Sequence, residues 1–427
     1  MSLDRRDFLK LGAAGIVLGA FPGCATTGSE IVKKEGQRVV IIGGGFGGAT
    51  AAKYIRKWSN NQIEVVLIER NTTFISCPMS NTVLGGIRTI SELTRNYDTL
   101  KSKYGIKLVQ GEVTAIDPQK QTVTLADGYL GYDRLIIAPG VDFMFEKIEG
   151  LNAKVAEQSI PHAWKAGAQT TMLRRQLESM QDGGVVAISI PKAPYRCPPG
   201  PYERACQIAY YLKKNKPKSK VLILDANPDI VSKKGLFLAA WKDLYPGMVE
   251  YRANAMVMQV QVNPSGRVAK TEFEDVKADV LNIIPPMKAG AVADMAGVVN
   301  VDKNWCAVDF TTYESTAQKN IHVIGDAISA ALPKSGHMAT SHAKICAAAI
   351  IELMQGQAPD STPVIANTCY SMVSGNEAVH VAHVYRFNAE KRAMIAADGG
   401  GVSGQRSEVE ATLANYWLKT ILDDVLA

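Results

Sequence analysis

The chain has 427 residues, of which 47% are hydrophobic, and it carries a formal net charge of +6. That length supports two or three domains with substantial cores, which is typical of an ordinary globular protein. The basic residues are spread along the chain without an aromatic-rich basic patch, which argues against nucleic acid as a partner. No apolar run is long enough to predict an integral membrane span.

Residues 1–28 predict an export signal rather than part of the fold. Arg5-Arg6 precedes the apolar stretch 11–21, which resembles a twin-arginine signal, although Asp4 stands where Ser or Thr is more usual. Such signals serve proteins that are exported already folded, so we expect a periplasmic location. Cys24 is a candidate lipoprotein acceptor, and a plain amphipathic first helix is the alternative.

Residues 39–50 form the most informative stretch of the chain. An apolar run is followed by Gly43, Gly45 and Gly48 in G-x-G-x-x-G spacing. A buried strand, a tight turn and a helix start produce this pattern, and the helix N-terminus then binds a pyrophosphate. The next strand-like run ends in Glu69, where a ribose hydroxyl needs an acceptor. We predict a dinucleotide site, against the alternative of a ligand-free glycine turn.

The segments that follow predict the rest of this unit. Cys77 lies in a polar loop, and Pro78 after it favours an extended, accessible thiol. Residues 107–117 and 121–125 alternate as short strands, and 131–140 is a buried strand that closes on a Pro-Gly turn. This order is typical of the first half of a flavin-binding domain.

A second unit begins near Asp182, with strands at 183–190 and 219–225. Between them, where a nicotinamide-binding unit has its own glycine turn, stands Arg196-Cys-Pro-Pro-Gly-Pro-Tyr-Glu-Arg204. Prolines remove backbone donors and exclude the compact glycine turn. We therefore expect a Rossmann-like unit that has lost its NAD site and gained Cys197.

The chain then returns to the first unit. Residues 321–327 are a strand that ends in Gly325-Asp326, and an alanine-rich helix covers 338–353. The Gly-Asp pair commonly sets a carboxylate against the ribityl chain of a flavin, and the next helix start points N–H groups at the ring carbonyls.

We predict an α/β protein with two Rossmann-like domains, as in glutathione reductase, and a C-terminal α+β domain. The expected bounds are 36–150 and 290–357 for the FAD-binding domain, 151–289 for the second Rossmann-like domain and 358–427 for a C-terminal interface domain.

The seven cysteines form no C-x-x-C, and His380 and His383 have no cysteine beside them. A zinc or haem site within the chain is therefore not expected, so any haem belongs to a partner. Three cysteines in apolar surroundings are expected to be buried as small hydrophobic residues. They are Cys206, Cys306 and Cys346.

Taken together, the motifs resemble the flavin-binding subunit of flavocytochrome c sulfide dehydrogenase over residues 36–427. The glycine and Gly-Asp motifs occur in many flavin disulfide reductases, whereas the Cys197-Pro-Pro-Gly-Pro-Tyr-Glu run with a distant Cys369 is far more specific. The other motifs that carry the resemblance are Ser76-Cys-Pro-Met-Ser-Asn81, Leu281-Asn-Ile-Ile-Pro-Pro286, Val323-Ile-Gly-Asp326 and Asn367-Thr-Cys-Tyr370.

The resemblance implies FAD held by an 8α-S-cysteinyl bond to Cys77; a free cysteine near the flavin is the alternative. It also implies a redox disulfide between Cys197 and Cys369; a purely structural crosslink between them is the alternative. Glu203 is a candidate acid or base, or simply a helix cap. The expected cofactor-binding residues are Gly43, Gly45, Gly48, Glu69, Arg70, Cys77, Val113, Ala138, Gly140, Gly325, Asp326, Ser335 and Gly336.

The resemblance further implies oxidation of hydrogen sulfide to sulfur or polysulfide, with electrons passed to a c-type cytochrome subunit. Hydrosulfide is expected to attack the disulfide, and the pattern does not say which cysteine receives the sulfur. The alternatives are a sulfide:quinone oxidoreductase, for which residues 414–426 would be a membrane-docking helix, and a non-catalytic exported flavoprotein that relays electrons. The missing second glycine turn disfavours an NADH-dependent reductase.

Overall fold

The computed structural model describes residues 28–263 and 266–427. The predicted twin-arginine motif and Cys24 lie outside the described residues. Along the described stretches, no helix is both long and apolar enough to cross a membrane.

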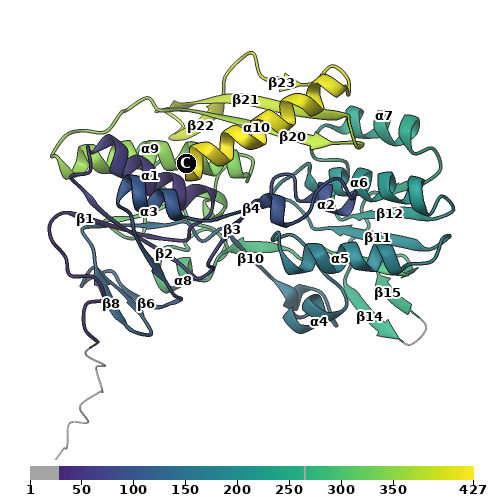
Figure 1. Ribbon diagram of the computed structural model, residues 1–427, viewed down its shortest axis with the longest axis horizontal. Helices are drawn as coiled ribbons and strands as arrows, with labels where there is room; N and C mark the ends of the chain where they lie inside the picture. The colour runs from purple at the N-terminus through teal and green to yellow at the C-terminus, as the bar shows by residue number, and fades with distance from the viewer. Residues whose placement is uncertain (1–27, 264–265) are drawn as a thin grey trace, which may run out of the picture.

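The first unit contains a five-stranded sheet in the order β19-β9-β1-β2-β5, with every neighbouring pair parallel. Its strands are β19 (Ile321–Val323), β9 (Arg134–Ile137), β1 (Arg38–Ile42), β2 (Glu64–Glu69) and β5 (Lys107–Gln110). β1 is buried along its whole length, which explains its continuous apolar run. Helices α1 (Phe46–Trp58) and α9 (Gly336–Met354) pack side by side on this sheet (Figure 1).

Shorter elements surround this sheet. A three-stranded antiparallel sheet follows β5, and a two-stranded pair flanks the Cys77 loop. The elements are β6 (Val113–Asp117), β7 (Thr122–Leu125), β8 (Gly128–Gly131), β3 (Phe74–Ile75), β4 (Thr94–Arg95), α2 (Asn81–Leu84), α3 (Asp98–Tyr104) and α8 (Val292–Met295).

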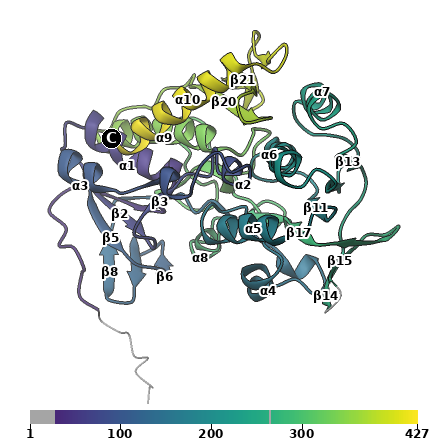
Figure 2. The same ribbon diagram turned by 45° about the vertical axis from the view of Figure 1, so that its right-hand side comes forward.

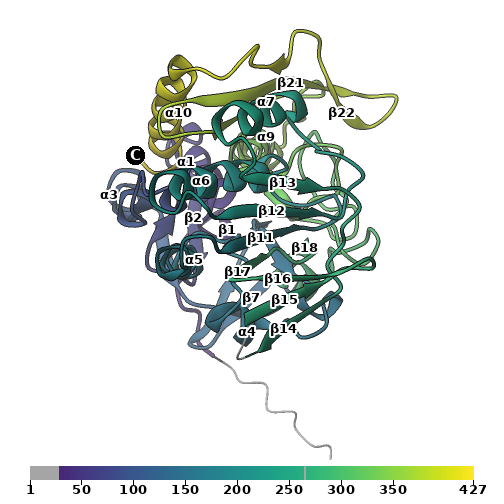
Figure 3. The ribbon, with the colours of Figure 1, turned by 90° about the vertical axis from the view of Figure 1, so that its right-hand side faces the viewer.

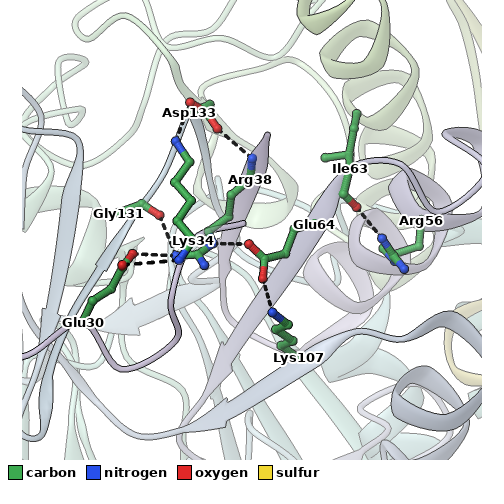
Figure 4. A network of polar contacts seen from close by, with 9 residues as sticks. All are labelled: Glu30, Lys34, Arg38, Arg56, Ile63, Glu64, Lys107, Gly131 and Asp133. Atoms are coloured by element: carbon green, nitrogen blue, oxygen red, sulfur yellow. Dashed lines mark hydrogen bonds and ion pairs between the residues drawn. The ribbon is translucent and has the colours of Figure 1, made fainter. Parts of the chain in front are cut away.

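One fully buried cation joins the start of β1 to its neighbours (Figure 4). Arg38 Nε donates to Glu64 on β2 at 2.5 Å, and Nη1 donates to Glu30 at 2.8 Å. Lys107 on β5 also pairs with Glu64. Burial alone would raise the pKa of Glu64, but the hydrogen bonds from Arg38 and Lys107 outweigh burial and hold it below its ordinary value. The network therefore links three strands and the segment before β1.

The second unit has a four-stranded parallel sheet in the order β13-β12-β11-β17, which Figure 3 views with β13 at the top. The strands are β13 (Val249–Arg252), β12 (Lys220–Asp225), β11 (Val185–Ile190) and β17 (Val280–Ile283). Helix α6 (Gly200–Asn215) packs on this sheet. The remaining elements are α4 (Ala153–Gln158), α5 (Ala168–Ser179), α7 (Lys234–Leu244) and the antiparallel strands β14 (Gln259–Asn263), β15 (Gly266–Lys270) and β16 (Asp275–Ala278).

The chain crosses between the two units twice, and the crossings pair with each other. β10 (Val141–Phe143) leaves the first unit and β18 (Met287–Ala289) returns to it, and they form an antiparallel ribbon. Two hydrogen-bonded crossings restrict the relative rotation of the units more than one flexible linker does.

The C-terminal unit is an antiparallel sheet covered by one helix. Its elements are β20 (Val364–Met372), β21 (Ala378–Asn388), β22 (Ala393–Ala396), β23 (Gly401–Val402) and α10 (Glu408–Leu426). In Figure 2 α10 lies above α1 and α9, and β20 contacts both α9 and α6. β20 thus bridges the two Rossmann-like units, and the architecture confirms the predicted fold class.

Candidate active site

The three glycines of the first turn have separable roles. A Cβ on Gly43, whose φ is +99°, would lie 2.4 Å from the Ala138 carbonyl oxygen, and a Cβ on Gly48 would lie 1.8 Å from the Gly43 oxygen. Both positions therefore exclude a side chain because of backbone packing. Gly45 has no atom near its virtual Cβ and lines a cavity. Gly45 thus leaves room for a ligand phosphate to approach the backbone.

Glu69 lies at the end of β2 and also lines this cavity. Its Oε2 accepts the Gly44 N–H at 2.6 Å, and its Oε1 accepts the Asn71 N–H at 2.8 Å. Each carboxylate oxygen accepts two hydrogen bonds. Since Asn71 Nδ2 takes the second position on Oε1, Oε2 keeps one for a ribose hydroxyl.

We call this space the glycine-turn cavity. It runs from the β1–α1 turn to the N-terminus of α9, and nine of the predicted cofactor-binding residues line it. They are Gly45, Glu69, Cys77, Ala138, Gly140, Gly325, Asp326, Ser335 and Gly336.

Four predicted cofactor-binding residues lie outside this lining: Gly43, Gly48, Arg70 and Val113. The Arg70 side chain is exposed and pairs with Glu112 at 3.2 Å. Val113 is buried in β6 among the strands of the small antiparallel sheet. The role of these residues in cofactor binding stays a prediction.

The far end of the glycine-turn cavity has the features that a ribityl chain and a flavin ring need. Burial raises the pKa of the Asp326 carboxyl, and the nearby Arg196 and Lys334 oppose that shift. The nineteen-residue helix α9 begins there at Gly336, so its free N–H groups face the cavity. The Ser335 hydroxyl already caps this helix, since it accepts the Met338 N–H at 3.0 Å. The residues present therefore fit an FAD.

A second space, the cysteine cavity, adjoins the first. It contains the three predicted catalytic residues, Cys197, Glu203 and Cys369. Five residues line both cavities: Cys77, Pro78, Arg196, Ser335 and Gly336. The two cavities therefore meet at Cys77, whose sulfur accepts the Ala166 N–H at 3.5 Å.

The structure brings Cys197 and Cys369 together from segments 172 residues apart in sequence. Cys197 has a left-handed backbone, with φ +58°, and its N–H donates to the Lys334 oxygen at 2.7 Å. Both cysteines are free thiols in this structure, so the disulfide stays a prediction. A hydrogen bond from Cys197 and the positive charge of Lys233 lower the pKa of Cys369, whereas the same hydrogen bond and burial raise the pKa of Cys197.

The other three described cysteines are fully buried, which confirms their prediction as small hydrophobic residues. They are Cys206, Cys306 and Cys346. Within residues 28–263 and 266–427, no group of His, Cys, Asp and Glu side chains is arranged to hold a metal ion.

Glu203 connects three parts of the fold instead of capping its own helix. Its Oε1 accepts the Met372 N–H of β20 at 3.0 Å, and its Oε2 accepts Asn81 Nδ2 at 2.9 Å. Burial raises the pKa of Glu203. A carboxyl with a raised pKa beside two thiols is suited to accept and return a proton.

Sequence reasoning missed a set of cationic residues around this site. Arg204 is buried and donates to Asn81 Oδ1 at 3.0 Å and to Asn282 Oδ1 at 2.8 Å. Arg196 lines both cavities, and its buried Nη2 has no partner among the described residues. Lys233 reaches β20 from the start of α7. Of these residues, only the two arginines could have been found from the sequence, because they begin and end the Arg196–Arg204 run that contains Cys197.

In the second unit, the acidic residue at the position where NAD-binding domains bind the ribose is not accessible. Asp225, at the end of β12, has no exposed surface. Its carboxylate accepts from the Tyr202 hydroxyl at 2.7 Å, the Tyr251 hydroxyl at 3.1 Å, and Asn227 through both its N–H at 2.9 Å and Nδ2 at 2.7 Å. A ribose hydroxyl cannot reach this carboxylate in the observed conformation.

Comparison with known families gives three matches along the chain. Residues 37–177 match the pyridine nucleotide-disulphide oxidoreductase family. Residues 170–285 match the central part of the sulfide dehydrogenase [flavocytochrome c] flavoprotein chain, and residues 361–426 match the flavocytochrome c sulphide dehydrogenase flavin-binding domain.

Individual relatives agree with these matches. The sulfide dehydrogenase [flavocytochrome c] flavoprotein chain of Chlorobaculum thiosulfatiphilum is 55% identical over 47 residues, which are 11% of this chain and 96% of that sequence. The mitochondrial sulfide:quinone oxidoreductase of Dictyostelium discoideum is 25% identical over 337 residues, 74% of this chain and 72% of that one. The sulfide:quinone oxidoreductase structure from Aquifex aeolicus aligns with a TM-score of 0.73 over 91% of both chains at 20% identity, which shows a shared fold.

Proposed function

The chain belongs to the family of flavocytochrome c sulfide dehydrogenase flavoprotein chains, and from this premise we propose that it oxidises hydrogen sulfide through a redox cysteine pair and FAD. One observation carries the proposal: the glycine-turn cavity and the cysteine cavity meet at Cys77, with Cys197, Cys369 and Glu203 in the second of them. The sulfur chemistry thus lies directly beside the space that fits a flavin.

The proposed chemistry starts from the oxidised pair. Hydrosulfide attacks one sulfur of the Cys197–Cys369 disulfide, so that the new S–S bond replaces the old one and leaves a persulfide and a thiolate. A second hydrosulfide takes the outer sulfur as a disulfide anion. The net change is two HS⁻ to HSS⁻, one proton and two electrons, and bound FAD supplies the two-electron oxidation that restores the disulfide.

Glu203 is the residue proposed to take and return the proton. We expect Glu203→Gln to lower sulfide turnover by about 10²-fold, since general acid–base catalysis contributes about that much or more. Because burial raises the pKa of this carboxyl, the wild-type rate, corrected for the fraction of sulfide present as HS⁻, should rise with pH through that raised value. Steady-state rates across the pH range check this, and an unchanged pH profile in Glu203→Gln contradicts the role.

We propose that FAD is attached through an 8α-S-cysteinyl bond to Cys77, which lies where the two cavities meet. Acid precipitation of wild-type protein should leave the flavin in the pellet, on a peptide that contains Cys77. In Cys77→Ser the flavin should pass into the supernatant. Flavin release from the acid-precipitated wild type would show that Cys77 is only a neighbour of the ring.

Electrons then leave to a c-type cytochrome subunit, and the protein works in the periplasm after twin-arginine export. The family membership supports the cytochrome acceptor, since its name pairs the flavoprotein with a flavocytochrome c. The closed Asp225 supports an acceptor other than NAD.

A quinone acceptor is the second candidate. Most of the apolar residues of α10 pack on the protein, but Val409, Leu413 and Tyr416 are exposed at 67%, 46% and 67%. These three residues have the i, i+4, i+7 spacing of one helix face, which would suit contact with a membrane surface.

One anaerobic titration separates these functions. Sulfide should bleach the flavin, and the reduced protein should then reduce cytochrome c without detergent, while a short-chain quinone reacts slowly. Fast quinone reduction would favour the second candidate. No bleaching by sulfide would favour a non-catalytic relay protein, and bleaching by NADH would revive an NADH-dependent reductase.

A further inference from the structure

Lys233 is a buried cation beside the cysteine pair to which the proposed chemistry gives no role. Lys233 is only 6% exposed, although it lies in a Ser-Lys-Lys-Gly stretch of the kind normally found on a protein surface. Its backbone is left-handed, with φ +54°, directly before α7. Such a conformation is unfavourable for a lysine, and so is burial of its charge, so the side chain must have compensating partners.

Those partners lie on β20. Lys233 Nζ donates to the Cys369 carbonyl oxygen at 3.0 Å and to the fully buried Ser371 hydroxyl at 2.8 Å. An ammonium has three N–H groups, so two of them fix the ammonium beside Cys369 and one is left for an anionic neighbour.

Burial lowers the pKa of Lys233, and the charges of four titratable groups from different elements oppose that shift. They are Cys369 on β20, Cys197 before α6, Glu203 on α6 and Glu410 on α10. Glu203 is already bound to Asn81 and Met372, and Glu410 to His380. Within this set, the cysteine whose own backbone is bound by the ammonium is Cys369.

We propose that Lys233 is the positioning residue that places the negative charge of the reduced cysteine pair on Cys369. The inference deepens the proposed sulfide chemistry and rests on it. In the oxidised pair, the sulfur that best accepts negative charge is the better leaving group. Hydrosulfide therefore attacks Cys197, the Cys197–Cys369 bond breaks, the persulfide forms on Cys197, and the electron pair of the broken bond leaves as the Cys369 thiolate beside Lys233.

Thiol reactivity in the reduced holoprotein tests this placement without any sulfide. The pair is reduced with a phosphine and alkylated with iodoacetamide across the neutral pH range, and peptide mass mapping gives separate rates for Cys369 and Cys197. In wild type, Cys369 should react faster at neutral pH. In Lys233→Gln, which keeps a donor but loses the charge, its rate should fall by about tenfold or more, as expected when a close opposite charge is removed.

Two variants separate charge from structure. Lys233→Arg should keep Cys369 fast, because the charge is kept. Lys234→Gln is the matched control, since Lys234 is adjacent, half-exposed and paired with Asp229, and it should match wild type. If Cys369 reacts equally fast in the two glutamine variants, the proposal is overturned. If Lys233→Gln does not fold, the alkylation rates of the wild type decide, because a faster reaction of Cys197 than of Cys369 also overturns the proposal.

Limiting hydrosulfide, followed by alkylation and peptide mapping, locates the added sulfur. Its presence on Cys197 supports the direction of attack, and its presence on Cys369 contradicts it. Absence of any sulfide reaction in wild type would count against the proposed function, whereas the alkylation rates still report on Lys233.

Discussion

Serine at either Cys197 or Cys369 should give a folded, yellow protein whose sulfide-dependent cytochrome c reduction falls by about 10³-fold or more. Loss of a residue that forms the covalent intermediate removes most of the rate enhancement in enzymes of this kind. Each substitution leaves the other cysteine without a disulfide partner, so hydrosulfide has no S–S bond to attack. Flavin absorbance and stopped-flow reduction by sulfide measure the effect.

A third cysteine provides the matched control. Cys306 is fully buried and lines neither cavity, so Cys306→Ala should keep near-normal turnover once its folding has been verified. Near-normal turnover in both serine variants would instead show that the pair is a structural crosslink, and the redox mechanism would have to be abandoned.

Removal of the Arg38 guanidinium should have the largest effect on stability. Arg38→Met leaves the Glu30 carboxylate without its ion-pair partner and Glu64 with Lys107 alone. Breaking a buried ion pair on one side costs about 3–5 kcal/mol. Because Arg38 lowers the pKa of Glu64, its contribution is present above the ordinary carboxyl pKa and is lost as the pH falls through the lowered value. The difference in the free energy of unfolding between Arg38→Met and wild type should therefore become smaller at acid pH.

Urea unfolding followed by circular dichroism at neutral and acid pH checks both statements. Arg70→Ala breaks an exposed pair between arginine and glutamate and is the matched control, with an expected loss of about 0–1 kcal/mol. If Arg38→Met is no less stable than Arg70→Ala, the network of Figure 4 contributes packing only.

Local backbone requirements were readable from sequence. Gly43 and Gly48 are needed because a Cβ would strike neighbouring backbone, whereas Gly45 leaves open space beside the glycine-turn cavity. Each of these backbone constraints arises within a turn of a few residues, so the spacing of the glycines in the sequence is enough to predict it. Continuous apolar runs likewise predicted the buried strands of the two parallel sheets, because each run lies within a single strand.

Contacts between distant segments were not readable. The bond from Lys233 to Cys369 spans 136 residues, and nothing in a Ser-Lys-Lys-Gly stretch indicates that the lysine turns inward. Glu203 was predicted because it lies close to Cys197 in sequence. Its contacts to Asn81 and Met372, in contrast, exist only because the first, second and C-terminal units pack together. The pairing of Arg70 with Glu112 is likewise a tertiary contact that its place after β2 does not indicate.

The closed Asp225 carboxylate bears on any attempt to convert this protein to nicotinamide use. Restoring three glycines in place of the proline-rich run would rebuild a phosphate turn, but the ribose acid would still be held by Tyr202, Tyr251 and Asn227. Tyr202 lies within the same run as Cys197, so freeing Asp225 disturbs the segment to which we assign the proposed sulfur chemistry. Cofactor engineering therefore cannot proceed by single steps here: each step toward a dinucleotide removes part of the existing function before the new one is available.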